Sequence, residues 1–173
     1  MILRYYGHSL FTMSLHNGMT LLTDPYGEFH EYPRQTLPAD IVTVSHHHHD
    51  HDAVGMVTGQ PTVLDQPGTY SPARDVLITG IPCKHDAQNG AQFGNNILFV
   101  IETEGLKIVH LGDLGHVLSD QQRLAIGKPD ILLTPVGGHF TTDATMALAN
   151  IRLLRPRVAI PMHYRNQYNE SAM

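Results

Sequence analysis

A run of histidines in the interior of the sequence constrains the fold more than any other feature. Residues 46–51 read His-His-His-His-Asp-His, and only Ser45 separates them from the apolar segment 41–44, Ile-Val-Thr-Val. A short β-branched run of this kind is typical of a buried strand. A purification tag would lie at a chain terminus, so an internal run that continues a strand indicates a functional site at the end of that strand.

The spacing within this run predicts which side chains act together. His46, His48, Asp50 and His51 form the pattern H-x-H-x-D-H. Side chains alternate in extended backbone, so His46 and His48 can face one side while the other two histidines face away. If His47 and His49 were the ligands instead, Asp50 and His51 would be at the wrong spacing for this pattern. Imidazole with carboxylate suits zinc, manganese or iron better than calcium or copper(I), so the sequence predicts a transition-metal site.

The composition indicates one soluble globular domain over residues 1–173. Hydrophobic residues make up 42% of the chain and charged residues 16%, as in ordinary globular proteins. No apolar stretch reaches the roughly 18 residues that a membrane span needs. A single cysteine, Cys83, excludes an internal disulfide, and the N-terminal residues lack the layout of a signal peptide. We therefore expect a cytoplasmic protein.

The charge balance argues against a nucleic-acid surface. Eleven Lys and Arg residues oppose 16 Asp and Glu, which gives a formal net charge of −5 without metal. No basic run appears, whereas nucleic-acid binding needs clustered Lys and Arg. We expect a small-molecule substrate as the partner, with neither nucleic acid nor membrane. Whether the chain forms a homo-oligomer is left open.

Turn and capping signals predict strands alternating with short helices. Asn17-Gly18 between two apolar runs predicts a hairpin, and residues 52–60 are expected to form a short helix. Ser119 and Gln122 have the spacing of a capping box, which predicts a helix start. A further helix is expected over residues 142–154, with Leu148 on its buried face.

Polar residues follow the strand ends in the same order in both halves of the chain. Each half has a hairpin that ends in aspartate and then two strands that end in histidine. These residues are Asp24, His46 and His85 in the first half, and Asp113, His139 and His163 in the second. Such self-similarity predicts two related β-rich halves that face each other, with chance similarity of short strands as the alternative.

Together these motifs resemble the metallo-β-lactamase superfamily of metallohydrolases. Further segments are similar to the branch that contains ascorbate-6-phosphate lactonase and small metal-dependent hydrolases. They are Gly7-His8-Ser9, Thr23-Asp24-Pro25, Gly137-Gly138-His139-Phe140-Thr141 and Pro161-Met162-His163-Tyr164. The likeness covers nearly the whole chain. It implies an α/β fold, a four-layer αββα sandwich with two similar halves.

The resemblance also implies a dinuclear centre with two divalent transition-metal ions. Zinc is the expected metal, and manganese and iron are the alternatives. The ligands would be His46, His48 and His85 for the first ion, Asp50, His51 and His163 for the second, and Asp113 as the bridge. Two cations about 3.5–4 Å apart can share a hydroxide. The expected function is hydrolysis of a small-molecule ester, lactone or phosphoester by that hydroxide. The alternatives are a nucleic-acid phosphodiesterase of the same superfamily and a non-catalytic metal-binding module.

The two carboxylates, Asp50 and Asp113, are the predicted catalytic residues. Both offset the mutual repulsion of the ions, and Asp50 could also orient the hydroxide or accept its proton. Asp24 is expected either to form a plain turn before Pro25 or to support the histidine loop from behind the ligands.

Three residues have open roles beside the expected centre. His8, His139 and Tyr164 each lie in or next to a motif that the resemblance covers. Each could bind substrate, donate a proton, support a ligand or simply pack.

Overall fold

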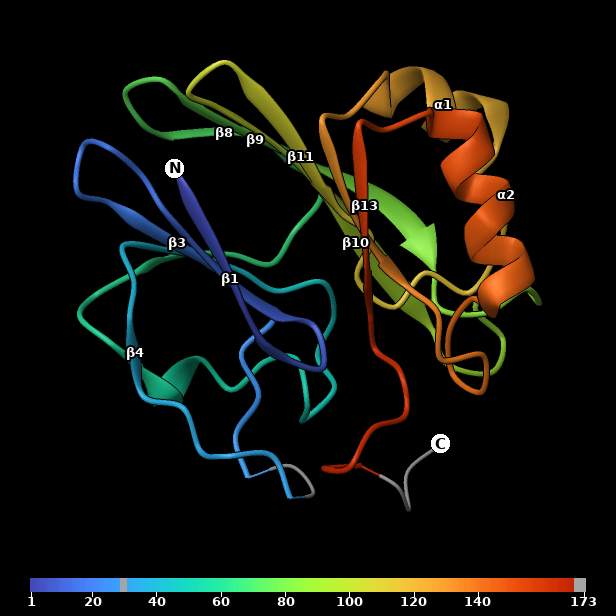
Figure 1. Cartoon of the computed structure of the whole chain (residues 1–173), viewed down its shortest axis with the longest axis horizontal. Helices are drawn as coiled ribbons and strands as arrows, with labels where there is room; N and C mark the ends of the chain where they lie inside the picture. Colours follow the sequence, from blue (N-terminus) through green and yellow to red (C-terminus); the bar gives the residue numbers. More distant parts are fainter. Residues whose placement is uncertain (29–30, 170–173) are drawn as a thin grey trace.

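Two β-sheets pack face to face, and a pair of α-helices covers the outer face of one of them (Figure 1). The computed structural model describes residues 1–28 and 31–169. The first sheet comes from the N-terminal part of the chain. Its strands are β1 (Ile2–Gly7), β2 (Leu10–Ser14), β3 (Thr20–Thr23), β5 (Ile41–Thr43) and β7 (Thr62–Leu64), adjacent in this order.

The second sheet and the helices come from the rest of the chain. The strands are β8 (Gly68–Ala73), β9 (Val76–Lys84), β10 (Asn95–Thr103), β11 (Leu106–His110), β12 (Ile131–Pro135) and β13 (Val158–Met162), adjacent in the same order. The helices are α1 (Asp120–Ile126) and α2 (Ala144–Leu154). Among the described residues, no helix is both long and apolar enough to cross a membrane.

The two sheets share one pairing pattern, as the repeat in the sequence predicts. In the first sheet the antiparallel pair β2–β3 is followed by β5 and β7, both parallel. In the second sheet the antiparallel pair β10–β11 is followed by β12 and β13, both parallel. The placement of the strand that leads to His85 is wrong in the sequence interpretation. That strand, β9, pairs with β10 over nine residues in the second sheet.

The apolar run of β10 is continuous because both faces of the second sheet are covered. Ile97, Phe99 and Ile101 face the core between the sheets, whereas Leu98 and Val100 face the core beneath the helices. A strand buried on both faces loses the alternation of apolar and polar residues. The site described below lies where the strands of both sheets end.

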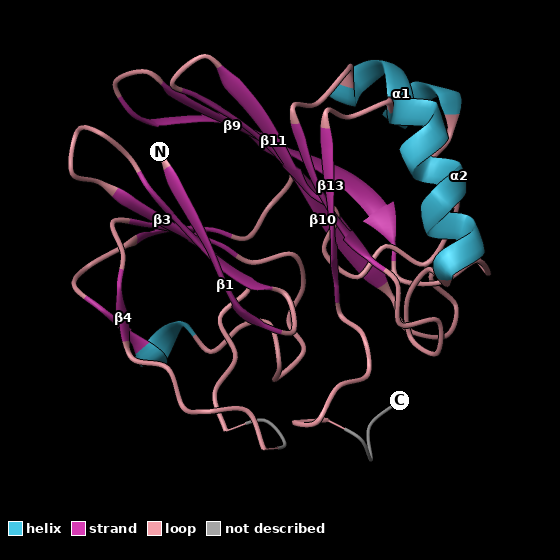
Figure 2. Cartoon of the chain, in the orientation of Figure 1, coloured by secondary structure: helices cyan, strands magenta, loops and turns pink. Residues whose placement is uncertain are grey.

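The outer face of the first sheet is covered mainly by loops, with the short strands β4 (Leu37–Pro38) and β6 (Val57–Thr58) and a short 3₁₀ helix among them, rather than by an α-helix (Figure 2). Tyr26 and Tyr32 are buried there against Leu10 of β2. The helix expected over residues 52–60 is wrong: only a three-residue 3₁₀ turn, η1 (Val54–Met56), forms, and it leads into a two-residue strand. Glycine costs about 1 kcal/mol relative to alanine inside a helix, and this stretch contains two. The α/β sandwich is as predicted, with an irregular fourth layer.

The other two predicted helices are present as α1 and α2. The capping box is confirmed, since Ser119 Oγ accepts a hydrogen bond from Gln122 N at 3.2 Å while Gln122 Oε1 accepts one from Ser119 N at 3.0 Å. The predicted buried face of α2 is partly wrong, because Leu148 is 45% exposed. The side chains that α2 buries are Ala147, Asn150 and Leu154.

Candidate metal centre

The histidine run turns away from the sheet directly after β5 and divides its side chains between two directions. His46 is buried and its Nε2 lies 3.0 Å from Nδ1 of His48. His47 points outward, where its ring nitrogens lie 3.4 Å from Asp52 and 3.6 Å from Asp65. This is the division that the sequence predicts, and it occurs in a loop with a bend at residues 45–46 and a turn at residues 49–51.

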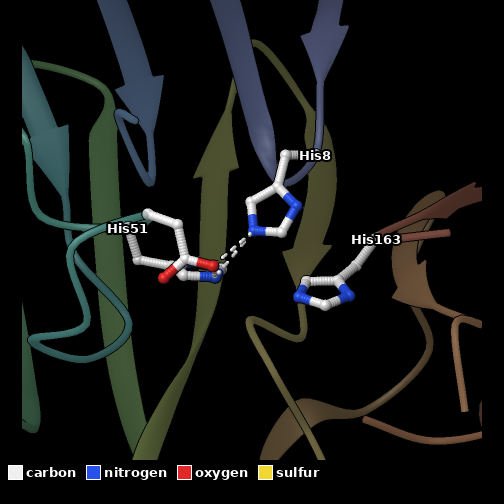
Figure 3. Close-up of side chains that lie close together, drawn as sticks. His8, His51 and His163 are labelled. Atoms are coloured by element: carbon white, nitrogen blue, oxygen red, sulfur yellow. Dashed lines mark hydrogen bonds and ion pairs between the residues drawn. The ribbon is translucent and has the colours of Figure 1, made fainter. Parts of the chain in front are cut away.

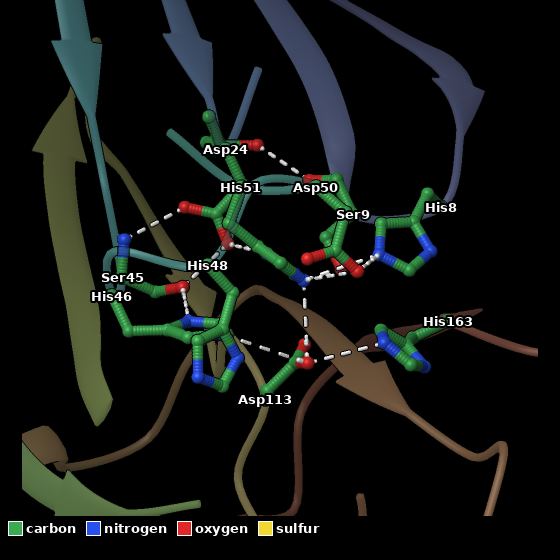
Figure 4. Close-up of polar contacts among 12 residues, drawn as sticks. His8, Ser9, Asp24, Ser45, His46, His48, Asp50, His51, Asp113 and His163 are labelled. Carbon is green, nitrogen blue, oxygen red and sulfur yellow. Dashed lines mark hydrogen bonds and ion pairs between the residues drawn. The ribbon is translucent and has the colours of Figure 1, made fainter. Parts of the chain in front are cut away.

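Asp113 lies at the centre of the site, just beyond the end of β11 (Figure 4). Its Oδ2 faces Nε2 of four histidines, at 3.1 Å for His163, 3.2 Å for His51, 3.3 Å for His85 and 3.9 Å for His46. The four histidines follow β5, β9 and β13, and Asp113 follows β11. The structure thus brings together the residues that the sequence places far apart.

The donor atoms form groups of the size that holds a metal ion. Within each group all ligand atoms lie within 4.8 Å of one another. The groups are His46 with His48 and His85; His46 with His51 and Asp113; and His8 with Asp50, His51 and His163. All seven ligands that the resemblance implies are included, and His8 joins them.

The chemistry of these residues fits a divalent transition metal. Within residues 1–28 and 31–169, the buried Nε2 of His85 and the buried Oδ1 of Asp113 make no hydrogen bond. A buried polar atom without a partner costs about 1–3 kcal/mol, and coordination would satisfy both atoms. Imidazole nitrogens with carboxylate oxygens are a donor set for zinc, manganese or iron.

Burial and neighbouring charges set the protonation of the imidazoles. Burial, reinforced by adjacent imidazoles, lowers the pKa of His8 to about 4 and that of His46 to about 3, so both are neutral at pH 7. Burial also opposes the cation of His51, but the nearby carboxylates of Asp113 and Asp24 outweigh it and raise the pKa of His51 well above its usual value.

Metal uptake at pH 7 is therefore expected to release protons. A metal ligand must be deprotonated, and His51 carries a proton in the metal-free chain, so its ligation releases about one proton. Lowering the pH should weaken binding because protons compete for the same nitrogen. Calorimetric titration in two buffers of different ionisation enthalpy measures the release. Equal apparent enthalpies in the two buffers would contradict the expectation.

Asp24 supports the histidine loop from behind, one of the two roles considered for it. Its fully buried carboxylate accepts hydrogen bonds from the backbone N of Ser45 at 2.8 Å, from Ser45 Oγ at 2.7 Å and from His51 Nδ1 at 2.9 Å. Because Ser45 Oγ donates to Asp24, it accepts from Nδ1 of His46 at 2.9 Å. These bonds leave Nε2 of His51 and of His46 directed at the centre.

Two supporting residues escape the sequence interpretation. The fully buried His110 donates from Nε2 to the carbonyl of Ser9 at 2.9 Å and accepts at Nδ1 from Gly112 N at 3.2 Å, so it is a neutral tautomer that links the two sheets. Asn96 Oδ1 accepts from the backbone N of Asp113 at 3.0 Å. His110 shares the strand that leads to Asp113, which is a weak signal, whereas Asn96 has none in the sequence.

His139 and Tyr164 lie beside the centre rather than in it. His139 is exposed, and its ring packs against Phe140 at 4.4 Å between centroids. The carbonyl of Phe140 accepts a hydrogen bond from Nδ1 of His85 at 3.1 Å. Tyr164 is half-buried and shares a hydrogen bond with Tyr5. In the described part of the chain, neither residue belongs to a group of candidate metal ligands, so their roles toward substrate stay predictions.

Comparison with known sequences identifies similar proteins over most of the chain. A family model described as a β-lactamase superfamily domain matches residues 2–163. A UPF0173 metal-dependent hydrolase of Thermoplasma acidophilum is 32% identical over 185 residues, which cover 92% of this chain and 81% of the relative. A UPF0173 metal-dependent hydrolase of Thermococcus onnurineus is also 32% identical, with coverage of 93% and 83%.

Solved structures give the same result. A Thermotoga maritima protein, described as a zinc-dependent hydrolase of the metallo-β-lactamase superfamily, superposes with a TM-score of 0.79 at 40% identity. The match covers 96% of this chain and 77% of that protein. A metallo hydrolase of Ignicoccus hospitalis superposes with a TM-score of 0.72 at 23% identity, covering 94% of this chain and 82% of that one, which shows a shared fold.

Proposed function

Because this chain belongs to the UPF0173 metal-dependent hydrolases of the metallo-β-lactamase superfamily, we propose that it hydrolyses a small-molecule ester, lactone or phosphoester at a pair of divalent transition-metal ions. The observation that carries the proposal is the position of Asp113, whose Oδ2 lies within 4.0 Å of four imidazole nitrogens. A carboxylate in that position can bridge two ions. The proposed ligands are His46, His48 and His85 for the first ion and Asp50, His51 and His163 for the second.

Bound ions of this kind supply a Lewis acid and, by lowering the pKa of water to about 7, a nucleophile at neutral pH. The side chains of this protein orient and balance that chemistry. Asp113 and Asp50 offset positive charge, and Asp24 fixes the tautomer of His51 through its 2.9 Å hydrogen bond.

Asp50 is suited to orienting the nucleophile. Burial opposes its ionisation, but the hydrogen bond from His8 and the charge of His51 outweigh burial and hold the pKa of Asp50 below its usual value. A carboxylate with a lowered pKa is a weak base. Asp50 therefore accepts a hydrogen bond from the attacking group more readily than it takes up the proton.

A small substrate is favoured over nucleic acid by the charge of the chain. The net charge is −5, and acidic residues outnumber basic ones by 16 to 11. Phosphate backbones are bound by clustered Lys and Arg, which this sequence lacks.

Metal analysis joined to a substrate panel tests the proposal. Untagged protein should hold about two transition-metal ions per chain and hydrolyse p-nitrophenyl acetate, a simple lactone or bis-(p-nitrophenyl) phosphate. Asp50→Asn should lower kcat by about 10²-fold or more, because the amide neither holds the ion nor orients the nucleophile as the carboxylate does. Asp52→Asn, a neighbouring carboxylate that pairs with the outward His47, is the matched control and should leave kcat unchanged. Metal-replete protein that is inert on the whole panel would instead support a non-catalytic module.

A further inference from the structure

We propose that His8 is an additional ligand of the second ion, so that the protein encloses this ion and the first ion offers the open position for substrate. The inference rests on the proposed dinuclear function and deepens it. The resemblance implies no metal ligand in the N-terminal strands, yet His8 follows β1 and lies in one group with Asp50, His51 and His163.

The distances around His8 are those between ligands of one ion. Two donors bound at about 2.1 Å and separated by an angle of about 90–110° lie roughly 3.0–3.4 Å apart. His8 Nε2 lies 3.1 Å from Nε2 of His51 (Figure 3) and 3.1 Å from Oδ2 of Asp50 (Figure 4). The neighbouring pair His46 and His48 shows the same separation, 3.0 Å.

The contact with His51 adds a third polar atom to the pair formed by His8 and Asp50. His51 donates from Nδ1 to Asp24, so its Nε2 is the ring nitrogen directed into the centre. His8 Nε2 thus faces two polar atoms, Asp50 Oδ2 and His51 Nε2, at the same distance of 3.1 Å. A cation between the three atoms would be bound by all of them.

The backbone conformations that place His8 against His163 are energetically unfavourable. Both residues have left-handed conformations, with φ of 52° and 49°. Such conformations cost about 1–2 kcal/mol per residue outside glycine and cluster at functional sites. His163 N donates to the carbonyl of His8 at 2.9 Å, and the two rings lie 4.2 Å apart between centroids. The strained pair brings two imidazoles from opposite sheets to one point.

Burial divides the centre into a closed and an open part. His8, His51 and His163 are at most 3% exposed, whereas His48 of the first group is exposed. With Asp113 as the bridge, the second ion has five protein donors and the first has four. For an ion that accepts five or six ligands, the first site therefore keeps more positions free than the second. A substrate oxygen is therefore expected at the first ion, on the side of His48.

The donor count also bears on the identity of the second ion. Zinc in structural sites is almost always four-coordinate. Three imidazoles and two carboxylates suit an ion that accepts five or six ligands, such as manganese(II) or iron(II). The second position should therefore prefer manganese or iron to zinc more strongly than the first position does.

His8→Gly tests the inference because glycine tolerates the left-handed backbone at this position. Metal content after stepwise chelation should show the first ion retained and the second bound at least about 100-fold more weakly. X-ray absorption should show fewer histidine ligands per metal, and imidazole added to the buffer should restore the second ion. His16→Gly removes a histidine whose side chain is 84% exposed and which belongs to none of the groups of candidate ligands among the described residues, and this variant should bind metal as the unaltered chain does.

The outcomes separate this inference from the proposed function. If His8→Gly keeps both ions with unaltered affinity, or loses affinity without a change in histidine ligation, His8 is not a ligand, while the dinuclear hydrolase stands. If the unaltered chain itself binds no transition metal, the proposed function fails and the inference with it.

Discussion

Asp113→Ala is expected to remove bound metal and to lower kcat by at least about 10³-fold, because loss of the proposed bridge would remove ions that are expected to stabilise the transition state by several kcal/mol. The Oδ2 of Asp113 faces four imidazole nitrogens at 3.1–3.9 Å. Burial alone would raise the pKa of Asp113, but the charges of His163 and His51 outweigh it and hold the pKa well below its usual value. Asp113 is therefore a carboxylate throughout the neutral range.

Comparing Asp113→Ala with Asp113→Asn separates the effect of losing the negative charge of Asp113 from the effect of changing the shape of its side chain. The amide fills the same space but brings no negative charge, so affinity for metal should fall although the fold is kept. Asp120→Ala removes a carboxylate that is 90% exposed on α1 and should leave metal content unchanged. Plasma emission analysis gives the metal content, and circular dichroism checks that the variants fold. Two ions retained in Asp113→Ala would exclude the bridging role.

The family, the hydrolase class and the α/β sandwich could be predicted from the sequence because their signals are local. The H-x-H-x-D-H pattern lies within residues 46–51, and Gly112-Asp113 follows its strand directly. Strand endings put polar groups at the edges of both sheets, where they meet. The motifs that carry the family resemblance therefore include the residues that the structure brings together around Asp113.

The rest depends on tertiary contacts that local pattern does not encode. The sequence does not indicate that β9 belongs to the second sheet, because an apolar run carries no information about the strand with which it pairs. His8 lies at the centre because its backbone is left-handed and its carbonyl accepts a hydrogen bond from His163, a residue near the other end of the chain. His139 follows β12 as His46 follows β5, yet it is exposed. Equivalent positions in two similar halves thus acquired different environments.

Gly112→Ala is expected to destabilise the metal-free chain by about 2–4 kcal/mol, the sum of a left-handed backbone and an overpacked contact. Gly112 has φ of 54°, and a Cβ there would lie 2.5 Å from Oδ1 of Asn96 and 2.6 Å from Cβ of Ser45. Asn96 and Ser45 are each 1% exposed. Neither can move freely, since Asn96 holds the backbone of Asp113 and Ser45 is bonded to Asp24.

Gly105→Ala separates these two costs. Gly105 also has a left-handed backbone, with φ of 74°, but a Cβ there meets nothing within 4 Å. Its destabilisation should be limited to about 1–2 kcal/mol from the backbone alone. Chemical unfolding of both metal-free variants gives the two values, and their difference is the cost of displacing Ser45 or Asn96. Because Ser45 and Asn96 position ligands, only Gly112→Ala should also lose affinity for metal. Equal free energies of unfolding and equal metal affinities in the two variants would show that the packing around Gly112 does not hold Asp113 in place.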